Sequence, residues 1–344
     1  MRSPASTASA RHPAPNPDRV EVTAPARLHF GFIDLHGGLG RCFGSLGLAI
    51  DRPQVRLSAC RSKSAAVVGP DSERVGRVLR VLEQHYGIGC PVQVQIEEAI
   101  PPHCGLGSGT QIALAAAAAV CALAGRTVSL PELANGLQRG ARSGVGCGVF
   151  ESGGFVVDGG RGQAQAAPPV ISRLPFPEKW RVVLLFDRQI TGLHGEQEAA
   201  AFRNLPRFPE RQAEHLARLV LMKLLPALAE TNLREFGSAL TELQQTIGDH
   251  FAPAQGGRYA SGRVERALKH LAAHGAAAHG QSSWGPTGFA IFEGQQEAEA
   301  AVRQLAQDRD GDLAYPESIQ IVRGCNHGMR LQPAFLSAGR AVAL

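Results

Sequence analysis

The segment IPPHCGLGSGTQIA, residues 100–113, decides the fold. It follows a strand-like alternation of apolar and polar residues at 92–96, and it opens an alanine-rich helix that extends from about Thr110 to Leu123. A strand, a glycine-rich turn and a helix in that order bring the backbone close to a ligand at a helix N-terminus, where N–H groups and the helix dipole bind anions. No Lys follows the glycines, so the segment is not a P-loop.

The residues of this turn are the expected ligand contacts. Ser108 or Thr110 could cap the helix, or their hydroxyls could touch a phosphate or a metal-bound water. An ordinary capped helix after a tight turn is the alternative interpretation. The residues expected to bind the anionic ligand are Gly105, Leu106, Gly107, Ser108, Gly109, Thr110 and Gln111.

A second glycine-rich stretch, Pro25 to Asp51, carries polar residues suited to a substrate site. Arg27 and Arg41 offer forked donors that grip phosphate or carboxylate bidentately. Asp34 could bind hydroxyls or a metal. For His29 in the same stretch, a structural role and a chemical one are equally consistent with the sequence.

A third stretch, QSSWGPTGFAIF at 281–292, places small and turn-forming residues before a strand. It could close over a ligand, or it could be a hairpin. Trp284 in this loop could stack on a ligand ring, and a packing role fits equally well.

Composition limits the classes of protein. The 344 residues are enough for about two domains. A net charge of +5 with no run of bases favours a small anionic ligand over a nucleic acid. Seven scattered cysteines without a CxxC pair argue against a disulfide framework and a zinc ribbon, and reduced thiols indicate the cytoplasm. The apolar run from Ile112 to Ala124 is too short to span a bilayer.

Along the chain, the patterns predict an α+β protein in two parts. The polar, proline-rich residues 1–19 look like a disordered tail and not a signal peptide. A first domain is expected at 20–165 and a second at 175–344, joined by an Ala/Pro-rich connection from Gly162 to Pro177. Apolar spacing predicts helices in the second part at 211–230, 232–248, 262–274 and 295–307.

The three stretches together resemble the motifs of the small-molecule kinases of the galactokinase, homoserine kinase, mevalonate kinase and phosphomevalonate kinase (GHMP) group. The matching residues are Pro25-Ala26-Arg27, Pro101 to Thr110, and Ser283 to Gly288. The resemblance covers about residues 20–335. It implies a two-domain fold, with an N-terminal mixed-sheet domain that carries the phosphate loop and a C-terminal ferredoxin-like α/β-sandwich.

The departures from the kinase pattern concern its catalytic parts. Gly109 stands where the kinase loop has a second Ser that helps to hold magnesium. The segment SGVGCGVF at 143–150 has no acid where kinases often place one, and the nearest acids are Glu151 and Asp158. Phosphoryl transfer needs positioned donors, a metal and often a base. The sequence therefore disfavours kinase chemistry.

One branch of the group shows similar departures, the β-ribofuranosylaminobenzene 5′-phosphate synthase family. The resemblance rests on four segments: IDLHGGLGR (33–41), HCGLGSGTQ (103–111), SGGFVVDGG (152–160) and TGLHGEQE (191–198). It implies that 4-aminobenzoate is joined to phosphoribosyl pyrophosphate with release of CO2 and pyrophosphate, in methanopterin biosynthesis. An ATP-dependent kinase and a ligand-binding relative without activity are the alternatives.

The resemblance sets expectations for the site. Catalytic roles are expected for Arg27, His29, Asp34, Arg41 and His194, with His327 as another candidate proton carrier. Mg²⁺ is the expected cofactor, with Ser108, Thr110 and Glu151 as candidate ligands. The expected partners are the two small anionic substrates and a second copy of the chain in a homodimer, with neither nucleic acid nor membrane.

Overall fold

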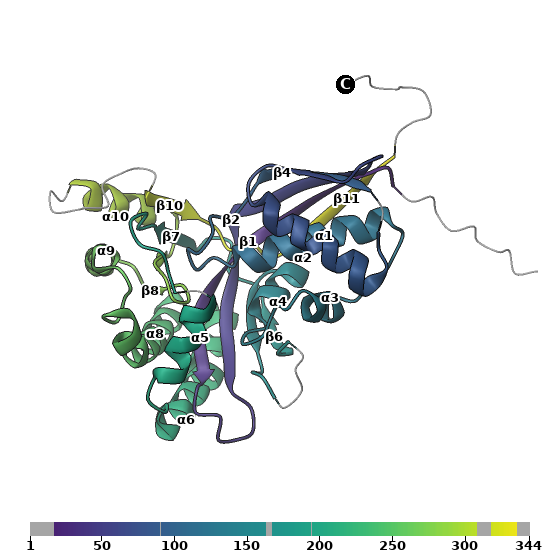
Figure 1. Ribbon diagram of the computed structural model, residues 1–344. Coiled ribbons are helices and arrows are strands. Elements are labelled where there is room, and N and C mark those ends of the chain that lie inside the picture. The colour runs from purple at the N-terminus through teal and green to yellow at the C-terminus, as the bar shows by residue number, and fades with distance from the viewer. Residues whose placement is uncertain (1–16, 90, 163–166, 194, 308–317, 336–344) are drawn as a thin grey trace, which may run out of the picture.

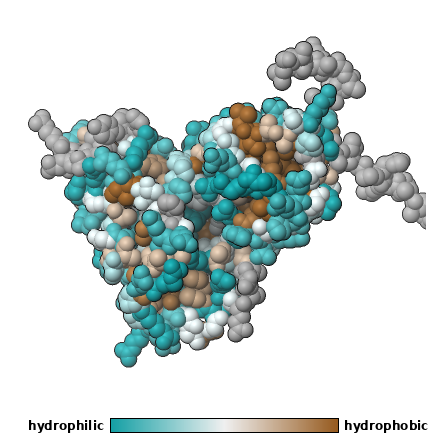
Figure 2. All heavy atoms as spheres, in the orientation of Figure 1, coloured by the Kyte–Doolittle hydropathy of each residue, from teal (hydrophilic) through white to brown (hydrophobic). Residues whose placement is uncertain are grey.

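The computed structural model describes residues 17–89, 91–162, 167–193, 195–307 and 318–335. Figure 1 shows two lobes, joined by the long strands β1 and β2. Figure 2 shows a notch between the lobes. Among the described helices, none combines the length and the apolar character needed to cross a bilayer.

A seven-stranded mixed sheet forms the first lobe, in the order β11-β1-β2-β4-β3, with β5 beside β2 and β6 beside β5. Its strands are β1 (Arg19–Asp34), β2 (Phe43–Arg61), β3 (Ala66–Val68), β4 (Val92–Glu98), β5 (Phe155–Asp158), β6 (Val170–Leu174) and β11 (Arg330–Ala334). β3 pairs with β4 in parallel and the other pairs are antiparallel.

The helices of this lobe are α1 (Ser72–Tyr86), α2 (Ser108–Leu123), α3 (Leu130–Gly136) and α4 (Val145–Ser152). α1 buries Val75, Val78 and Leu82, which recur at helical spacing. α2 is buried along most of its length, because its alanines let it pack closely between the sheet and its neighbours. This central position places the start of α2 inside the molecule.

The second lobe contains a four-stranded antiparallel sheet in the order β10-β7-β9-β8. Its strands are β7 (Arg181–Leu185), β8 (Ala278–Gln281), β9 (Gly288–Phe292) and β10 (Ile319–Val322). Its helices are α5 (Gly195–Asn204), α6 (Glu210–Leu219), α7 (Leu225–Ala229), α8 (Leu233–Gln255), α9 (Gly262–Ala273) and α10 (Gln295–Gln307), with a π-helical turn at Val220–Leu224. When the four strands are numbered by their order along the chain, their order across the sheet is fourth, first, third, second. This order confirms the predicted ferredoxin-like sandwich.

An aromatic cluster continues the core from one lobe into the other. Phe30 of β1 lies 5.8 Å from the ring of Phe155 in the first sheet and 4.9 Å from that of Phe289 in the second. Phe32 meets Phe202 and Phe251 edge-on. The lobes therefore share one hydrophobic core, and β1 carries it between them.

The predicted domain boundary is wrong in two places. The expected connection from Gly162 to Pro177 contains β6, which pairs with β5, so the first sheet continues past residue 165. The chain also returns from the second lobe, and β11 pairs with the outer edge of β1. Both strands satisfy backbone groups that an edge would otherwise leave open.

Three other predictions change at their ends. Residues 1–16 of the expected tail lie outside the described residues, and β1 begins at Arg19, within that tail. The helix predicted at 211–230 is divided by the π-helical turn, and the last of its parts begins at Leu225 with Pro226 in its first turn. The helix predicted at 232–248 continues to Gln255.

Candidate functional site

The glycine-rich turn leads into α2 and leaves the N-terminus of this helix without a side-chain cap. Gly105 and Gly107 have φ of +82° and +77°, in the left-handed region that favours glycine. Gly107 is the N-cap of α2, and no side chain caps the helix, so the prediction that Ser108 or Thr110 caps it is wrong. The first turn also carries no acid. Its N–H groups and dipole are therefore available to an anion.

Arg27 lies against this turn. Its backbone N–H donates to the Leu106 carbonyl at 3.1 Å, and its Nη1 donates to the Gly105 carbonyl at 2.9 Å. A Cβ on Gly107 would lie 2.9 Å from Arg27 Cγ, so this glycine makes room for the side chain. The Nε of Arg27 is enclosed and has no hydrogen-bond partner. Arg27 thus brings a positive charge and a spare donor to the loop.

Burial lowers the pKa of Arg27 to about 10, and the nearby Glu198 carboxylate opposes that shift. Arg27 stays protonated at neutral pH. Glu198 itself pairs with Arg142 at 3.0 Å, and the Arg142 guanidinium lies 4.8 Å from the centre of the Phe202 ring. The second lobe therefore brings a carboxylate, through α5, to the side of the loop where Arg27 lies.

His29 is buried two residues further along β1, with 2 % of its surface exposed. Burial, and then the charge of Arg27, hold the pKa of His29 well below its usual 6.5. Its Nδ1 accepts a hydrogen bond from the Gly31 N–H at 3.2 Å, and its own backbone N–H donates to Ser282 Oγ at 3.0 Å. At neutral pH His29 is therefore an uncharged ring held in place, and it has no extra proton to deliver.

Ser282 joins the two lobes at this point. Its hydroxyl donates to the Gly105 carbonyl at 2.7 Å while accepting from the His29 N–H. A Cβ on Gly105 would lie 2.3 Å from the Ser282 carbonyl oxygen. The two segments of the chain can therefore approach this closely only because residue 105 is glycine. The third stretch is the hairpin between β8 and β9, and its turn contacts the phosphate loop through a serine that the sequence did not single out.

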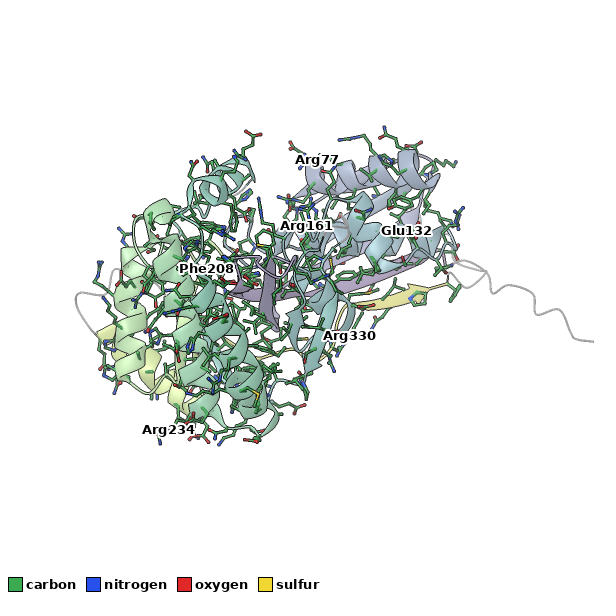
Figure 3. The ribbon with its side chains drawn as sticks, turned by 90° about the horizontal axis from the view of Figure 1, so that it is seen from below. Arg77, Glu132, Arg161, Phe208, Arg234 and Arg330 are labelled. Atoms are coloured by element: carbon green, nitrogen blue, oxygen red, sulfur yellow. The ribbon has the colours of Figure 1, made fainter. Side chains whose placement is uncertain are left out.

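Arginines from other elements surround the same helix end. A Cβ on Gly109 would lie 2.4 Å from Arg74 Nη1 and 3.4 Å from Arg139 Nη1. Figure 3 shows Arg77 and Arg161 on the side of the first lobe that faces the second. The site residues expected from the sequence do not include Arg74, Arg139, Arg142 and Glu198, because only folding brings these separate segments together. Glu198 does lie in the segment TGLHGEQE (191–198), which resembles the synthase family, and that resemblance was the available signal for it.

The structure does not bring Asp34 and Arg41 to the phosphate loop. They lie at the tip of the β1–β2 hairpin, and seven residues of strand, roughly 20 Å, separate Asp34 from Arg27. Asp34 Oδ1 accepts from the N–H groups of His36 and Gly37, both at 2.8 Å, and so shapes the turn.

Arg41 holds the tip of this hairpin to the end of β5. Its Nε and Nη2 donate at 2.7 Å to the carbonyls of Gly159 and Gly160. These donors are satisfied by backbone, so the expected anion contact of Arg41 is replaced by a structural one.

The two acids nearest the expected kinase position are placed elsewhere. Glu151 lines a surface pocket with Cys121 and Ala122, at the opposite end of α2 from Ser108 and Thr110. The proposed metal ligands are therefore not brought together.

Asp158 is fully buried, and four donors surround its carboxylate: the N–H groups of Ser45, Gly144 and Gly160, and the Ser143 hydroxyl. Burial raises its pKa in spite of these bonds. Asp158 therefore supports the start of α4 and does not face a ligand.

Ser108 is nearly buried in the first turn of α2, with 9 % of its surface exposed. The Thr110 side chain lies against Gly146, whose Cβ would be 3.2 Å from Thr110 Cγ2. Gln111 is buried and its Nε2 donates to the Gly146 carbonyl at 2.8 Å, so it fixes α4 against α2. Among the described residues, no three His, Cys, Asp or Glu side chains form a group that could hold a metal ion.

The remaining candidates lie apart or outside the described chain. His194 is outside the described residues. His327 lies beside Cys325 in a cavity of about 350 Å³, which is lined by β1 and β2 residues such as Glu21 and Arg56. Trp284 is buried and stacks on Phe251 with ring centres 4.3 Å apart, so the packing role is the one observed.

Comparison with known proteins gives matches to both halves of the chain. Residues 73–155 match the GHMP kinases N terminal domain and residues 224–310 match GHMP kinases C terminal. A beta-ribofuranosylphenol 5'-phosphate synthase from Archaeoglobus fulgidus is 32% identical over 327 residues, which covers 91% of this chain and 99% of that protein. The protein of the same name from Methanothermobacter thermautotrophicus is 29% identical over 79% of this chain and 88% of its own.

Solved structures share the fold. Homoserine kinase from Cytophaga hutchinsonii superposes with a TM-score of 0.62 at 20% identity, over 92% of this chain and 98% of that one. Mevalonate diphosphate decarboxylase from Staphylococcus aureus superposes with a TM-score of 0.64 at 11% identity, again over 92% and 98%. At these identities the likeness concerns the fold alone.

Proposed function

Because the chain belongs to the beta-ribofuranosylphenol 5'-phosphate synthase family, on the GHMP kinase fold, we propose that it transfers the phosphoribosyl group of phosphoribosyl pyrophosphate to a 4-substituted benzoate. The chain is an enzyme. The products are an aryl riboside 5′-phosphate, CO2 and pyrophosphate.

The proposed reaction balances without an added oxidant or base. The ring carbon that bears the carboxylate forms a bond to C1 of the ribose, and the C1–oxygen bond to pyrophosphate breaks with its electron pair on the leaving oxygen. The bond from the ring to the carboxylate then breaks, CO2 leaves, and that electron pair restores the aromatic ring. Charge therefore develops at two places: on the leaving pyrophosphate and at C1.

The phosphate loop supplies what the leaving group needs. The uncapped start of α2 and the Arg27 guanidinium present fixed donors and positive charge to an anion that gains charge as C1–O breaks. Preorganised donors of this kind stabilise the transition state because they need no reorientation during the reaction. The Ser282 hydroxyl, which accepts from the His29 backbone N–H, donates to the Gly105 carbonyl and so holds the loop in position.

The observation that carries the proposal is that this loop is bounded by cations, and that the two described carboxylates beside it, Glu198 and Asp71, are paired with Arg142 and Arg74. Asp158 is enclosed by four donors, and Glu151 is at the far end of α2. A kinase base would have to be one of these two acids on the sequence pattern, and the structure places neither there. The arrangement therefore favours departure of pyrophosphate over transfer of a phosphoryl group.

The identity of the aromatic acid is the finer part of the proposal. The name of the archaeal relatives specifies a phenol, which in this reaction corresponds to 4-hydroxybenzoate as acceptor. The sequence resemblance pointed to 4-aminobenzoate and to methanopterin biosynthesis. Both acids have the para donor that makes the carboxylate-bearing carbon nucleophilic, so we propose a para-hydroxy or para-amino benzoate.

We propose Mg²⁺ as the counter-ion that enters with the pyrophosphate group. Ser108 and Thr110 offer the hydroxyl oxygens of the loop, and Mg²⁺ commonly takes most of its ligands from substrate phosphates and water. Glu151, on α4, lies beside the far end of α2 and does not complete such a set, so the donor set fits an ion held chiefly by the substrate. A homodimer and a cytoplasmic location remain predictions, and sedimentation of the purified protein tests the first.

The test is incubation with carboxyl-labelled 4-hydroxybenzoate or 4-aminobenzoate, phosphoribosyl pyrophosphate and Mg²⁺. We expect labelled CO2 and pyrophosphate in equal amounts, and the faster acid identifies the acceptor. A parallel incubation with ATP and homoserine or mevalonate is the control for the kinase alternative. ATP consumption there, with no labelled CO2 from either acid, would overturn the proposal.

A further inference from the structure

Gly109 is the residue at which the loop departs from the kinase pattern, and the structure shows what takes the place of the missing side chain. The space that a Cβ would fill is occupied by Arg74 Nη1, 2.4 Å away, with Arg139 Nη1 at 3.4 Å. Gly109 is the second residue of α2, and its φ is not in the left-handed region. Glycine therefore leaves room here for the end of the Arg74 side chain, and its backbone conformation does not require glycine.

Arg74 is fixed in this position from the other side. It lies on the first turn of α1, and its Nε donates to the Asp71 carboxylate, 3.0 and 3.1 Å from the two oxygens. Its side chain is only 18% exposed. Because Asp71 occupies Nε, the Nη groups are directed away from Asp71 and over the start of α2.

Arg139, which follows α3, completes a pair with Arg74. Its Nε is enclosed without any hydrogen-bond partner. Burial lowers the pKa of Arg139, and the charges of Arg74 and Arg77 lower it further, while Asp71 is the carboxylate that opposes them. Several guanidinium groups therefore share one acid beside an open helix end, which is an arrangement that an anion would neutralise.

We propose that Arg74 and Arg139 form a second anion subsite at Gly109, which binds the outer phosphate group of the pyrophosphate moiety. Arg27 lies at Gly107 on the same loop, so two of the loop's three glycines, Gly107 and Gly109, each have a cation beside them. This inference rests on the proposed function and assigns the donor specificity of the site: the enzyme selects a diphosphate ester over a monophosphate. In place of the second kinase Ser, this chain uses a fixed guanidinium.

Direct binding of inorganic pyrophosphate tests the subsite without turnover. Calorimetry with Mg²⁺ present would give the Kd for the unaltered protein and for Arg74→Gln and Arg139→Gln. We expect each substitution to weaken binding about ten- to a hundredfold, as the loss of a charged hydrogen bond implies. Arg80→Gln is the matched control: it removes an exposed arginine from the same helix, and its Kd should stay within twofold of that of the unaltered protein.

Gly109→Ala is the sharper variant. Alanine suits a helix better than glycine, so the thermal midpoint should be unchanged or higher, while the new Cβ displaces the end of the flexible Arg74 side chain. We expect a loss of pyrophosphate affinity with no loss of folding, which separates the subsite from general damage to the protein.

The outcomes distinguish this inference from the proposed function. If labelled CO2 forms but pyrophosphate affinity is unchanged in Arg74→Gln and Arg139→Gln, the subsite is wrong and the function stands. If no CO2 forms but pyrophosphate binds and both variants weaken it, the subsite stands and the function is wrong. Ribose 5-phosphate is the second probe: if the variants weaken it and leave pyrophosphate unaffected, the assignment to the pyrophosphate moiety is overturned.

Discussion

At the scale of single residues, the environment decides what each predicted side chain can do. Arg27 and His29 were selected by type, as a cation and a proton carrier. In the fold Arg27 keeps its charge beside the phosphate loop, with a pKa of about 10. His29 is buried next to that charge and loses its capacity to be protonated near neutral pH. The pair therefore provides one fixed cation and one neutral support.

The state of His29 can be measured directly. Since its pKa lies well below 6.5, its ring should remain neutral between pH 6 and 8 in the folded protein. The unfolded chain takes up that proton below about 6.5, so this histidine lowers stability as the pH falls through that value. NMR of the ring carbons should show no titration of His29 in this range. A His29 midpoint above 6 would contradict the assignment.

A contrast between two arginines tests the corrected site. Arg41→Ala should cost about 1 kcal/mol of stability, through two hydrogen bonds to backbone carbonyls at an exposed site, and leave the KM for phosphoribosyl pyrophosphate unchanged. Arg27→Gln should lower kcat/KM about a hundredfold or more, because it removes the charge beside the loop. Urea unfolding and steady-state kinetics measure both effects. Equal losses of activity in the two variants would restore Arg41 to the site.

At the scale of elements, a strand separates residues that are close in the sequence. Arg27 and Asp34 belong to one short motif, but an extended chain advances about 3.3 Å per residue and carries Asp34 to the hairpin tip. A helix start has the opposite effect, because it gathers the backbone groups of Gly107 to Thr110 at one point. Compactness of a motif in sequence therefore predicts compactness in space only where the chain turns or coils.

The buried Asp158 is an element-scale support, and its removal should affect stability. It holds the start of α4 to β2 and β5, so Asp158→Asn would turn an amide N–H₂ toward backbone N–H donors. We expect a loss of about 1–3 kcal/mol in urea unfolding. Asp249→Asn, at an exposed ion pair with Arg258, is the control and should cost less than about 1 kcal/mol. An unchanged free energy in Asp158→Asn would show that these bonds are not what holds α4.

At the scale of the whole molecule, the site exists only where the two lobes meet. The first lobe provides the loop and Arg27, while the second provides Ser282 beneath Gly105 and Glu198 beside Arg27. The shared aromatic core fixes the lobes against each other at this point. The position of the phosphate loop is therefore a property of both lobes.

Ser282→Ala tests this coupling. The change leaves the buried His29 N–H without an acceptor and removes one of the two donors to the Gly105 carbonyl, so it should cost about 1–3 kcal/mol of stability. Displacement of the loop should also lower kcat/KM by about tenfold. Ser238→Ala, at an exposed hydroxyl that accepts from Lys223, is the matched control for both measurements. Wild-type kinetics in Ser282→Ala would show that the loop keeps its position without the second lobe.

The sequence by itself determined the local chemistry of the loop and the class of fold. Glycines at 105 and 107 before an alanine-rich helix dictate a backbone turn and a helix end, because these depend on neighbouring residues only. Alternating and helical spacings predicted an α+β protein, and the resemblance in the motifs implied the ferredoxin-like second lobe, which the strand order confirms. The resemblance in the motifs gave the family, which comparison with the archaeal relatives confirms.

Tertiary structure decided which side chains surround the loop. Arg74, Arg139, Glu198 and Ser282 come from separate segments, and no local pattern distinguishes them from other polar residues on exposed helices or in turns. Packing also moved β11 into the first sheet and placed Asp34 and Glu151 away from the loop. The reason is physical: backbone conformation follows from nearby residues, whereas charge, burial and hydrogen-bond partners depend on contacts between residues far apart in the chain.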